Sequence, residues 1–227
     1  SAQFIPYSSQ NVDAQLSYDQ LLDNPMIPTV DVLRAQHVIM PWIQNHEPFI
    51  LIGPEGAGKK MILNNCFKSL KNTQIVSVHC NAQTQASNVI QKLMQFCGIY
   101  TSGQSKVLRP RDSENLVLYL RDINLPKPDE YGTTQLISFL QQILTYNCFY
   151  DDELDIVQLE KIQIIASMNP SSSVGRYPLS TRLTSIVRIC FLSYPETEQL
   201  LSIYTEFARV VCQQRFSSHP IWSNSSN

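Results

Sequence analysis

A glycine-rich segment between an expected strand and an expected helix is the feature that most constrains this chain. Residues 53–60 read Gly-Pro-Glu-Gly-Ala-Gly-Lys-Lys, with the G-x-x-x-x-G-K spacing of a phosphate-binding loop. In such a loop, backbone N–H groups turn toward phosphate oxygens and the following helix N-terminus adds partial positive charge. The segment therefore predicts nucleotide binding, and the alternative is a tight strand-to-helix turn.

The loop keeps its phosphate-binding lysine but departs from the usual pattern one residue later. Lys59 is expected to reach the terminal phosphates. Lys60 stands where a Ser or Thr hydroxyl would ligate Mg²⁺, and an ammonium group cannot ligate a metal. The alternative for Lys60 is a solvent-facing helix residue. The residues expected to contact the nucleotide here are Gly53, Glu55, Gly56, Ala57, Gly58, Lys59, Lys60 and Met61.

Apolar runs alternate with segments of helical periodicity along the chain. Strands are expected at 48–52, 74–79, 116–120, 162–167 and 186–192, and helices at 31–45, 59–70, 86–97, 132–146 and 196–212. Strands too apolar to face water predict an α/β fold of three layers around a mostly parallel, five-stranded sheet. Asp31 is expected to cap the first helix, which should kink or divide at Pro41. Residues 149–159 predict a hairpin, and 98–111 a loop or small hairpin.

The composition of the chain argues against several other classes of function. The chain has 227 residues, 43% of them hydrophobic, which is enough for one large α/β domain or two small ones. A net charge of −2 indicates neither a nucleic-acid partner nor a membrane partner. Six separated cysteines without a C-x-x-C pair predict free thiols in a reducing compartment. The four histidines lack ligand spacing, and the acidic segment 151–155 predicts a solvated turn rather than a calcium site.

A second strand end is the best candidate for the acids that a phosphate-loop ATPase needs. Such enzymes use an Asp for Mg²⁺ and usually a neighbouring acid that orients water. After the expected strand 116–120, only Asp122 is acidic, and Arg121 precedes it. Asn169, after the strand at 162–167, is a candidate polar sensor of the terminal phosphate. One of three later arginines is a candidate arginine finger toward a neighbouring module: Arg176, Arg182 or Arg188, with Arg182 preferred.

Several short motifs resemble the AAA+ ring of dynein heavy chains. They are Ile-Pro-Thr-Val-Asp at 27–31, the phosphate loop, Asp-Ile-Asn-Leu-Pro at 122–126, Tyr-Gly-Thr at 131–133, and Gly-Arg at 175–176. The resemblance implies a large AAA+ subdomain at 26–216, after an extended lead-in at 1–25 and before a polar tail at 217–227. The helical lid would be absent. Ile27, Pro28 and Val30 would flank the adenine.

The resemblance also implies a place in a motor. Ile-Asn-Leu-Pro with Tyr-Gly-Thr is similar to the third of six ring modules, and the segments 78–84, 109–112 and 116–122 are similar to the intraflagellar-transport (second cytoplasmic) dynein. The implied partners are neighbouring AAA+ modules, microtubules and dynein subunits, with no nucleic acid or membrane. The implied locations are the cytoplasm, the cilium and the cytoskeleton.

Aligned on that family pattern, Arg121 stands where the metal-binding Asp belongs, and Asp122 where the catalytic Glu belongs. The resemblance therefore implies that the module holds ATP or ADP with weak or absent Mg²⁺ and little hydrolysis. Because Lys60 and Arg121 together carry two positive charges, we expect them to face the phosphates in place of the metal. The alternatives are a working regulatory ATPase and a nucleotide-free scaffold. A small-molecule kinase is disfavoured, because no motif for a second substrate is present.

Overall fold

The computed structural model describes residues 25–102 and 105–216. A five-stranded sheet lies at its centre, in the order β2-β5-β8-β1-β9, and all of its strand pairs are parallel. Its strands are β1 (Phe49–Ile52), β2 (Thr73–His79), β5 (Asn115–Arg121), β8 (Ile162–Met168) and β9 (Arg188–Phe191). The expected five strands are confirmed. The expected tail and, apart from residue 25, the lead-in lie outside the described residues.

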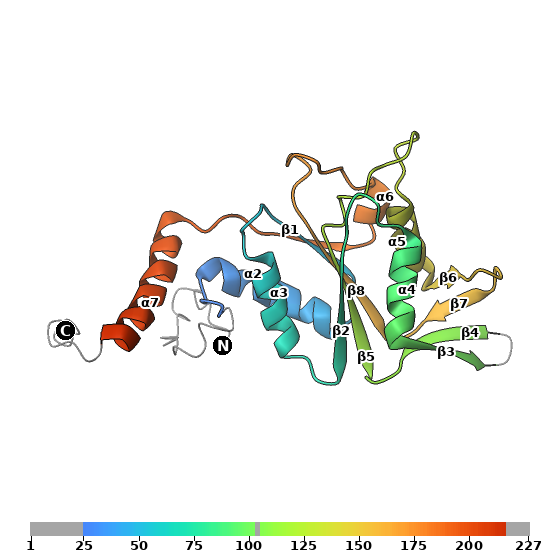
Figure 1. Ribbon diagram of the computed structural model, residues 1–227, viewed down its shortest axis with the longest axis horizontal. Coiled ribbons are helices and arrows are strands. Elements are labelled where there is room, and N and C mark those ends of the chain that lie inside the picture. Colours follow the sequence, from blue (N-terminus) through green and yellow to red (C-terminus); the bar gives the residue numbers. More distant parts are fainter. Residues whose placement is uncertain (1–24, 103–104, 217–227) are drawn as a thin grey trace, which may run out of the picture.

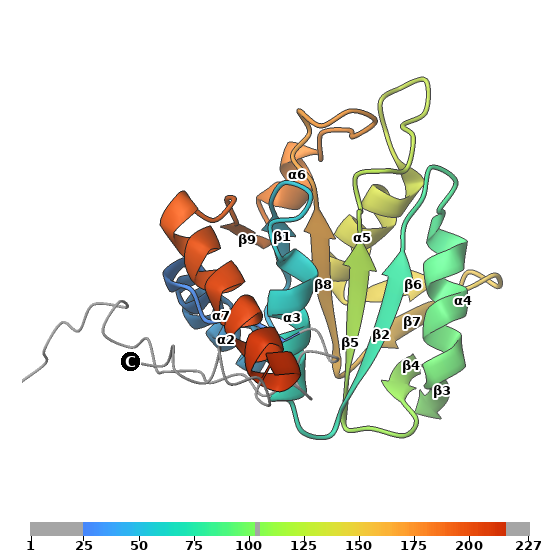
Figure 2. The same ribbon diagram turned by 60° about the vertical axis from the view of Figure 1, so that its left-hand side comes forward.

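Helices cover both faces of this sheet (Figure 1). One face packs against α2 (Val30–Gln44) and α3 (Lys59–Lys68), and the other against α4 (Ala86–Phe96), α5 (Gln135–Tyr146) and the short α6 (Thr181–Thr184). Figure 2 shows the sheet between these two groups of helices. The last helix, α7 (Thr197–Phe216), extends away from the sheet on the side of α2 (Figure 1). The expected three-layer α/β class is confirmed.

Strand β5 shows why each strand is almost continuously apolar. Leu116, Leu118 and Leu120 belong to the core beneath α4 and α5. Val117 and Tyr119 belong to the second core, beneath α2 and α3. All five side chains are buried, because the strand has helices on both faces and neighbours on both edges. Its carboxyl end therefore has a fixed position next to the ends of β2 and β8.

Two hairpins form a second sheet beside the first. The strands β3 (Cys97–Ser102), β4 (Ser105–Pro110), β6 (Cys148–Tyr150) and β7 (Ile156–Leu159) lie in the order β3-β4-β7-β6. The hairpin expected at 149–159 is confirmed, and the polar segment at 98–111 is a hairpin too.

The acidic turn between β6 and β7 is solvent-exposed, as expected, and its carboxylates also form an ion-pair cluster with one lysine. The Nζ atom of Lys106 on β4 lies 2.7 Å from Asp151, 2.8 Å from Asp155 and 3.4 Å from Glu153. These carboxylates, Asp151 foremost, raise the pKa of Lys106 above its ordinary value. The lysine therefore supplies the cation of this cluster and joins the two hairpins.

The first helix differs from expectation at its start, and it is not divided in its middle. The N-cap residue is Thr29, and Asp31 lies in the first turn, because the N–H of Leu33 already donates to the Thr29 carbonyl at 2.9 Å. Pro41 lies inside one continuous helix instead of dividing it. Although proline lacks an N–H, its own carbonyl accepts from the N–H of Asn45 at 2.9 Å, so the helical pattern continues.

The helix expected from residue 132 begins later, at Gln135. Gly132 has a φ of +74°, which a helix does not accommodate. The carboxylate of Asp129 accepts hydrogen bonds from the N–H groups of Tyr131 and Thr133 at 3.0 and 2.7 Å. These bonds fold residues 129–133 into a turn before the helix starts.

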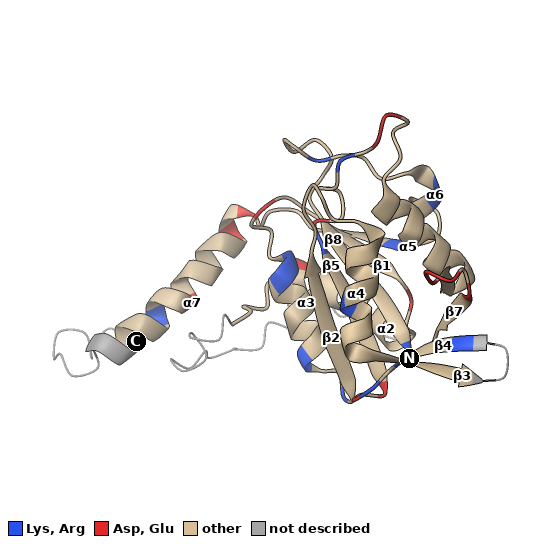
Figure 3. Ribbon diagram, turned by 45° about the vertical axis from the view of Figure 1, so that its right-hand side comes forward, with Lys and Arg blue, Asp and Glu red and all other residues tan. Residues whose placement is uncertain are grey.

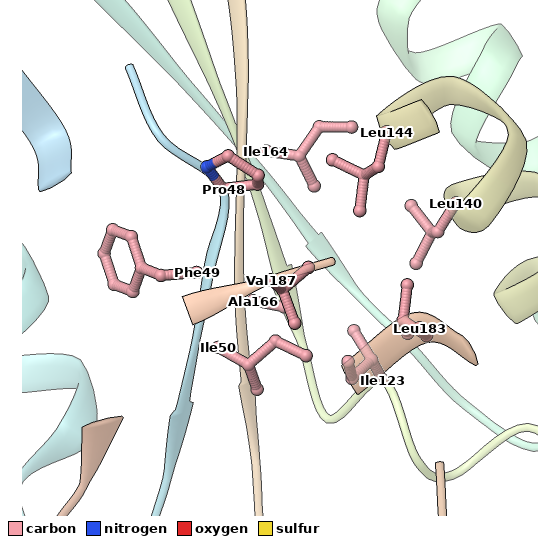
Figure 4. A pocket seen from close by; sticks show the side chains of 10 residues that line it. All are labelled: Pro48, Phe49, Ile50, Ile123, Leu140, Leu144, Ile164, Ala166, Leu183 and Val187. Carbon is pink, nitrogen blue, oxygen red and sulfur yellow. The ribbon is translucent and has the colours of Figure 1, made fainter. Parts of the chain in front are cut away.

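A small apolar cavity lies between the sheet and the helices α5 and α6 (Figure 4). Its volume is about 10 Å³, and it is lined by Pro48, Phe49, Ile50, Ile123, Leu140, Leu144, Ile164, Ala166, Leu183 and Val187. It has room for one water at most and is too small for a ligand. The buried Ile123 lies against it and so anchors the chain directly after Asp122.

Among the described helices, none has the length and apolar character to cross a membrane.

Gln163 ties the start of β8 to the turn between α2 and β1. Its buried amide donates to the carbonyls of Trp42 and Glu47 at 3.1 and 2.8 Å. Gln163→Leu should lower the free energy of unfolding by about 1–3 kcal/mol, because both carbonyls lose a partner in the interior. The matched control is Gln158→Leu on β7, where the side chain is exposed. Urea unfolding measures both, and an equal effect of the two substitutions would contradict this role.

Candidate nucleotide-binding site

The phosphate loop joins β1 to α3 through glycines in the left-handed region. Gly56 and Gly58 have φ of +80° and +81°, a conformation that costs glycine little because it has no Cβ. Gly58 is the N-cap of α3, and the first bond of the helix runs from the N–H of Ile62 to the Gly58 carbonyl at 3.0 Å. The N–H groups of residues 59–61 therefore have no partner within the helix and are available to a phosphate.

The segment after β9 holds the start of this loop. A Cβ added to Gly53 would lie 2.8 Å from the carbonyl oxygen of Leu192, so only glycine permits this approach. Two residues later in that segment, the Tyr194 hydroxyl donates to the Glu55 carbonyl at 2.6 Å. Sequence reasoning missed Tyr194, because it lies in an irregular segment far from the loop in sequence. The loop is thus supported from two distant parts of the chain.

The ammonium group of Lys59 is already surrounded by acceptors. It donates to the carbonyls of Gly53 and Pro54 at 2.6 and 2.8 Å and to Oδ1 of Asn169 at 2.8 Å. Burial is the main cause that lowers the pKa of Lys59, while the carboxylates of Asp122 and Glu55 oppose the shift. Because the three donors of an ammonium group are all used, a phosphate must replace at least one of these acceptors.

Asn169, the candidate polar sensor, lies between Lys59 and Glu55. It is 3% exposed at the carboxyl end of β8, and its Nδ2 donates to Oε1 of Glu55 at 2.8 Å. Its carbonyl accepts from Nδ2 of Asn124 at 2.8 Å, which fixes the backbone. Asn169 therefore connects Lys59 to Glu55. Its role toward a terminal phosphate stays a prediction.

Asp122 follows β5 in a left-handed conformation. Its φ is +57°, and its N–H donates to the Ser167 carbonyl at 2.8 Å. Its carboxylate lies 3.0 Å from NH1 of Arg176. The expected acid is thus at the strand end, but it is ion-paired with an arginine.

Arg121 is turned toward β2 instead of toward the phosphate loop. Its guanidinium stacks over the ring of Tyr119 at 5.0 Å, and its NH1 lies 3.1 Å from Nε2 of His79. The loop follows β1, and β8 separates β1 from β5. Lys60, at the basic start of α3 (Figure 3), is exposed. The structure therefore does not bring Arg121 to the loop, contrary to the expectation that both cations face the phosphates.

Arg176 is the arginine that lies in the site. Its side chain is 11% exposed, and its NH2 is 3.6 Å from Oε1 of Glu55 in the phosphate loop. The sequence suggested Arg176 only as one of three candidate fingers toward a neighbour. Of the others, Arg188 pairs with Glu47 at 2.8 Å, and Arg182 is exposed on α6. The signal for Arg176 was its position in the loop that follows Asn169.

The segment expected to flank the adenine begins α2 or immediately precedes it. Ile27 is buried, whereas Pro28 and Val30 are partly exposed. Met26 and Ala57 pack against the same core cluster, so this segment and the phosphate loop lie on the same side of the sheet. Contact with an adenine stays a prediction.

Comparison with known proteins adds to this geometry. The family model described as "P-loop containing dynein motor region" matches residues 14–195. The chain belongs to this dynein family. Cytoplasmic dynein 2 heavy chain 1 of Tripneustes gratilla is 52% identical over 204 residues, and that of Homo sapiens 49%, each alignment covering 89% of this chain and 5% of the relative. The cytoplasmic dynein 2 heavy chain 1 of Chlamydomonas reinhardtii is 46% identical over 198 residues, which cover 86% of this chain and 5% of that relative. The chain thus spans about 5% of the curated dyneins it matches.

A solved structure shows the same fold. A protein of Cytophaga hutchinsonii superposes with a TM-score of 0.50 at 13% identity, covering 84% of this chain and 55% of that one. At this identity the likeness concerns the fold alone. Together with the family match, it agrees with a large AAA+ subdomain of a dynein heavy chain.

Gly53→Ala tests the support of the phosphate loop. The added Cβ meets backbone at 2.8 Å, so the loop and the segment after β9 must separate. We expect a loss of about 1–3 kcal/mol in the free energy of unfolding. The control is Gly98→Ala, whose Cβ has the side chain of Tyr100 as its nearest neighbour, at 3.2 Å; this side chain is half-exposed and can rotate. Thermal unfolding of both variants is the measurement, and an unchanged stability of Gly53→Ala would contradict the close approach.

Proposed function

We propose that this chain is a nucleotide-binding AAA+ module of a dynein heavy chain that holds ATP or ADP and hydrolyses ATP weakly or not at all. The observation that carries the proposal is the contrast between two halves of one site. In the half formed by the phosphate loop, Lys59 and Asn169, hydrogen bonds join the lysine, the asparagine and Glu55. The half that would hold a metal and activate water has cations where oxygen ligands belong.

The residues present do not fit a Mg²⁺ ion bound as in phosphate-loop ATPases. Mg²⁺ requires oxygen ligands, such as a hydroxyl and a carboxylate. Lys60 occupies the hydroxyl position, and Arg121 precedes the only acid at the end of β5. That acid, Asp122, is paired with Arg176 at 3.0 Å. Without a metal ligand or a free general base, bound nucleotide is retained and attack by water is slow.

The parent protein is proposed to be an intraflagellar-transport dynein, with this chain as the third ring module. The proposal is supported by the relatives named cytoplasmic dynein 2 heavy chain 1 and by the Ile-Asn-Leu-Pro segment at 123–126. Its partners would be the neighbouring modules, microtubules and dynein subunits, in the cytoplasm and the cilium. The exposure of Arg182 on α6 is compatible with its proposed role as an arginine finger toward a neighbouring module.

The second candidate function is a working ATPase that regulates the motor. The position of Asn169 favours it, because this side chain contacts both Lys59 and Glu55 as a phosphate sensor would. The two functions predict different rates of hydrolysis at the same affinity. A single-turnover assay therefore distinguishes them.

The triple substitution Lys60→Thr, Arg121→Asp and Asp122→Glu should raise hydrolysis at this site. It supplies a hydroxyl and a carboxylate for Mg²⁺ and lengthens the acid. A positioned general base contributes about 10²–10⁴-fold in rate, so we expect the rate of hydrolysis to rise at least about 100-fold. The measurement is single-turnover hydrolysis by the parent heavy chain with its other nucleotide sites disabled.

The control pair is Lys68→Thr with Arg111→Asp, which makes the charge changes of the first two substitutions at exposed positions outside the site. We expect no gain from it. Rapid hydrolysis by the unsubstituted module would contradict the proposal and favour the regulatory ATPase.

A further inference from the structure

The guanidinium of Arg176 is held inside the site by two carboxylates but is not saturated by them. Its side chain is 11% exposed, with NH1 3.0 Å from Oδ1 of Asp122 and NH2 3.6 Å from Oε1 of Glu55. NH1 is buried and makes no hydrogen bond to any described residue, so its approach to Asp122 is an ion pair without hydrogen-bond geometry. A buried donor whose N–H groups make no hydrogen bond is costly even beside a carboxylate, and an anionic ligand in suitable geometry would satisfy it.

Four charged side chains lie close to one another beside the phosphate loop, and the charges of these four cancel. Lys59 and Arg176 are positive, whereas Glu55 and Asp122 are negative. Besides burial, which is the larger cause, the nearby Arg176 contributes to the lowered pKa of Lys59. Two carboxylates next to a phosphate would repel it unless a cation lies between them. In this structure, Arg176 contacts both carboxylates.

We propose that Arg176 is the internal cation of this site, which neutralises Asp122 and Glu55 and donates to a nucleotide phosphate, so that ADP binds without Mg²⁺. The proposal rests on the nucleotide binding proposed above. It assigns the charge role expected for Lys60 and Arg121 to a different residue. Arg121 is occupied by His79 and Tyr119, and Lys60 is exposed.

The chain around Arg176 holds the guanidinium in place. Gly175 has a φ of +73°, and the N–H of Arg176 donates to the Ser173 carbonyl at 3.2 Å. The N–H of Tyr177 donates to the carbonyl of the buried Asn124 at 3.0 Å. An arginine suits this position, because its planar fork of donors can contact several oxygens at once without losing its charge.

If Arg176 has this role, its removal should not only weaken ADP binding but also make binding depend on Mg²⁺. Without Arg176, Lys59 alone faces the two carboxylates, and an arriving phosphate meets more negative charge than in the natural site. A divalent cation could then bind between Asp122, Glu55 and the phosphate, since carboxylate and phosphate oxygens are ligands that Mg²⁺ prefers. Removal of Arg176 should therefore create a dependence on Mg²⁺ that the natural site lacks.

The test measures binding of radiolabelled ADP by equilibrium dialysis, with Mg²⁺ or with EDTA. It uses the parent heavy chain with its other nucleotide sites disabled. The natural chain should bind ADP equally in the two buffers, within about twofold. Arg176→Met should bind at least about tenfold more weakly in EDTA and regain most of that loss with Mg²⁺.

Two variants keep the test independent of folding. Arg176→Lys retains the charge and should stay insensitive to Mg²⁺ even if its affinity falls. Arg188→Met removes an arginine that pairs with Glu47 at 2.8 Å outside the site, and it should match the natural chain. ADP binding by Arg176→Met that equals the natural chain in EDTA would overturn the proposal, as would a natural chain that needs Mg²⁺. Absence of ADP binding by the natural chain in both buffers would instead overturn the proposed function.

Discussion

The ammonium group of Lys59 is the contact on which the rest of the site depends. It joins the end of β1, through the carbonyls of Gly53 and Pro54, to the end of β8, through Asn169. Because Asn169 also binds Glu55, the loop is closed onto the sheet before any phosphate arrives. The left-handed glycines and the close approach of the segment after β9 permit this geometry. A nucleotide would thus bind to a phosphate loop whose conformation is already formed.

At the carboxyl ends of the strands, the groups that bind phosphate are present, whereas the groups that hydrolysis needs in addition are not free. Binding needs backbone N–H groups, a lysine and charge balance, and the phosphate loop with Lys59 and Arg176 offers all three. Hydrolysis needs in addition a metal ligand and a base, and Asp122 is ion-paired instead. A module that binds without turnover would act in the ring as a fixed structural joint, whose nucleotide stabilises the folded state by mass action.

The elements and half of the site could be predicted from the sequence, because their signals are local. Residues 116–120 are a continuous apolar run, and the loop has a fixed spacing of Gly and Lys. The direction of Arg121 could not be predicted, since it depends on His79 across a strand pair. Nor could the position of Arg176, which lies in an irregular loop and is placed by partners from two distant segments. Pro41 failed as a helix break because a single missing N–H does not end a helix that is packed against a core.

The most direct measurement of the central claim is the nucleotide content of the purified parent heavy chain, counted after denaturing extraction. Lys59→Ala removes a charge-assisted contact and should weaken ADP binding by about 2 kcal/mol or more, once desolvation has offset part of the ion-pair energy. Compared with the natural chain and with Lys68→Ala on the exposed end of α3, the Lys59→Ala chain should then carry less nucleotide, by up to one molecule per heavy chain. Equal nucleotide content in all three proteins would contradict the account.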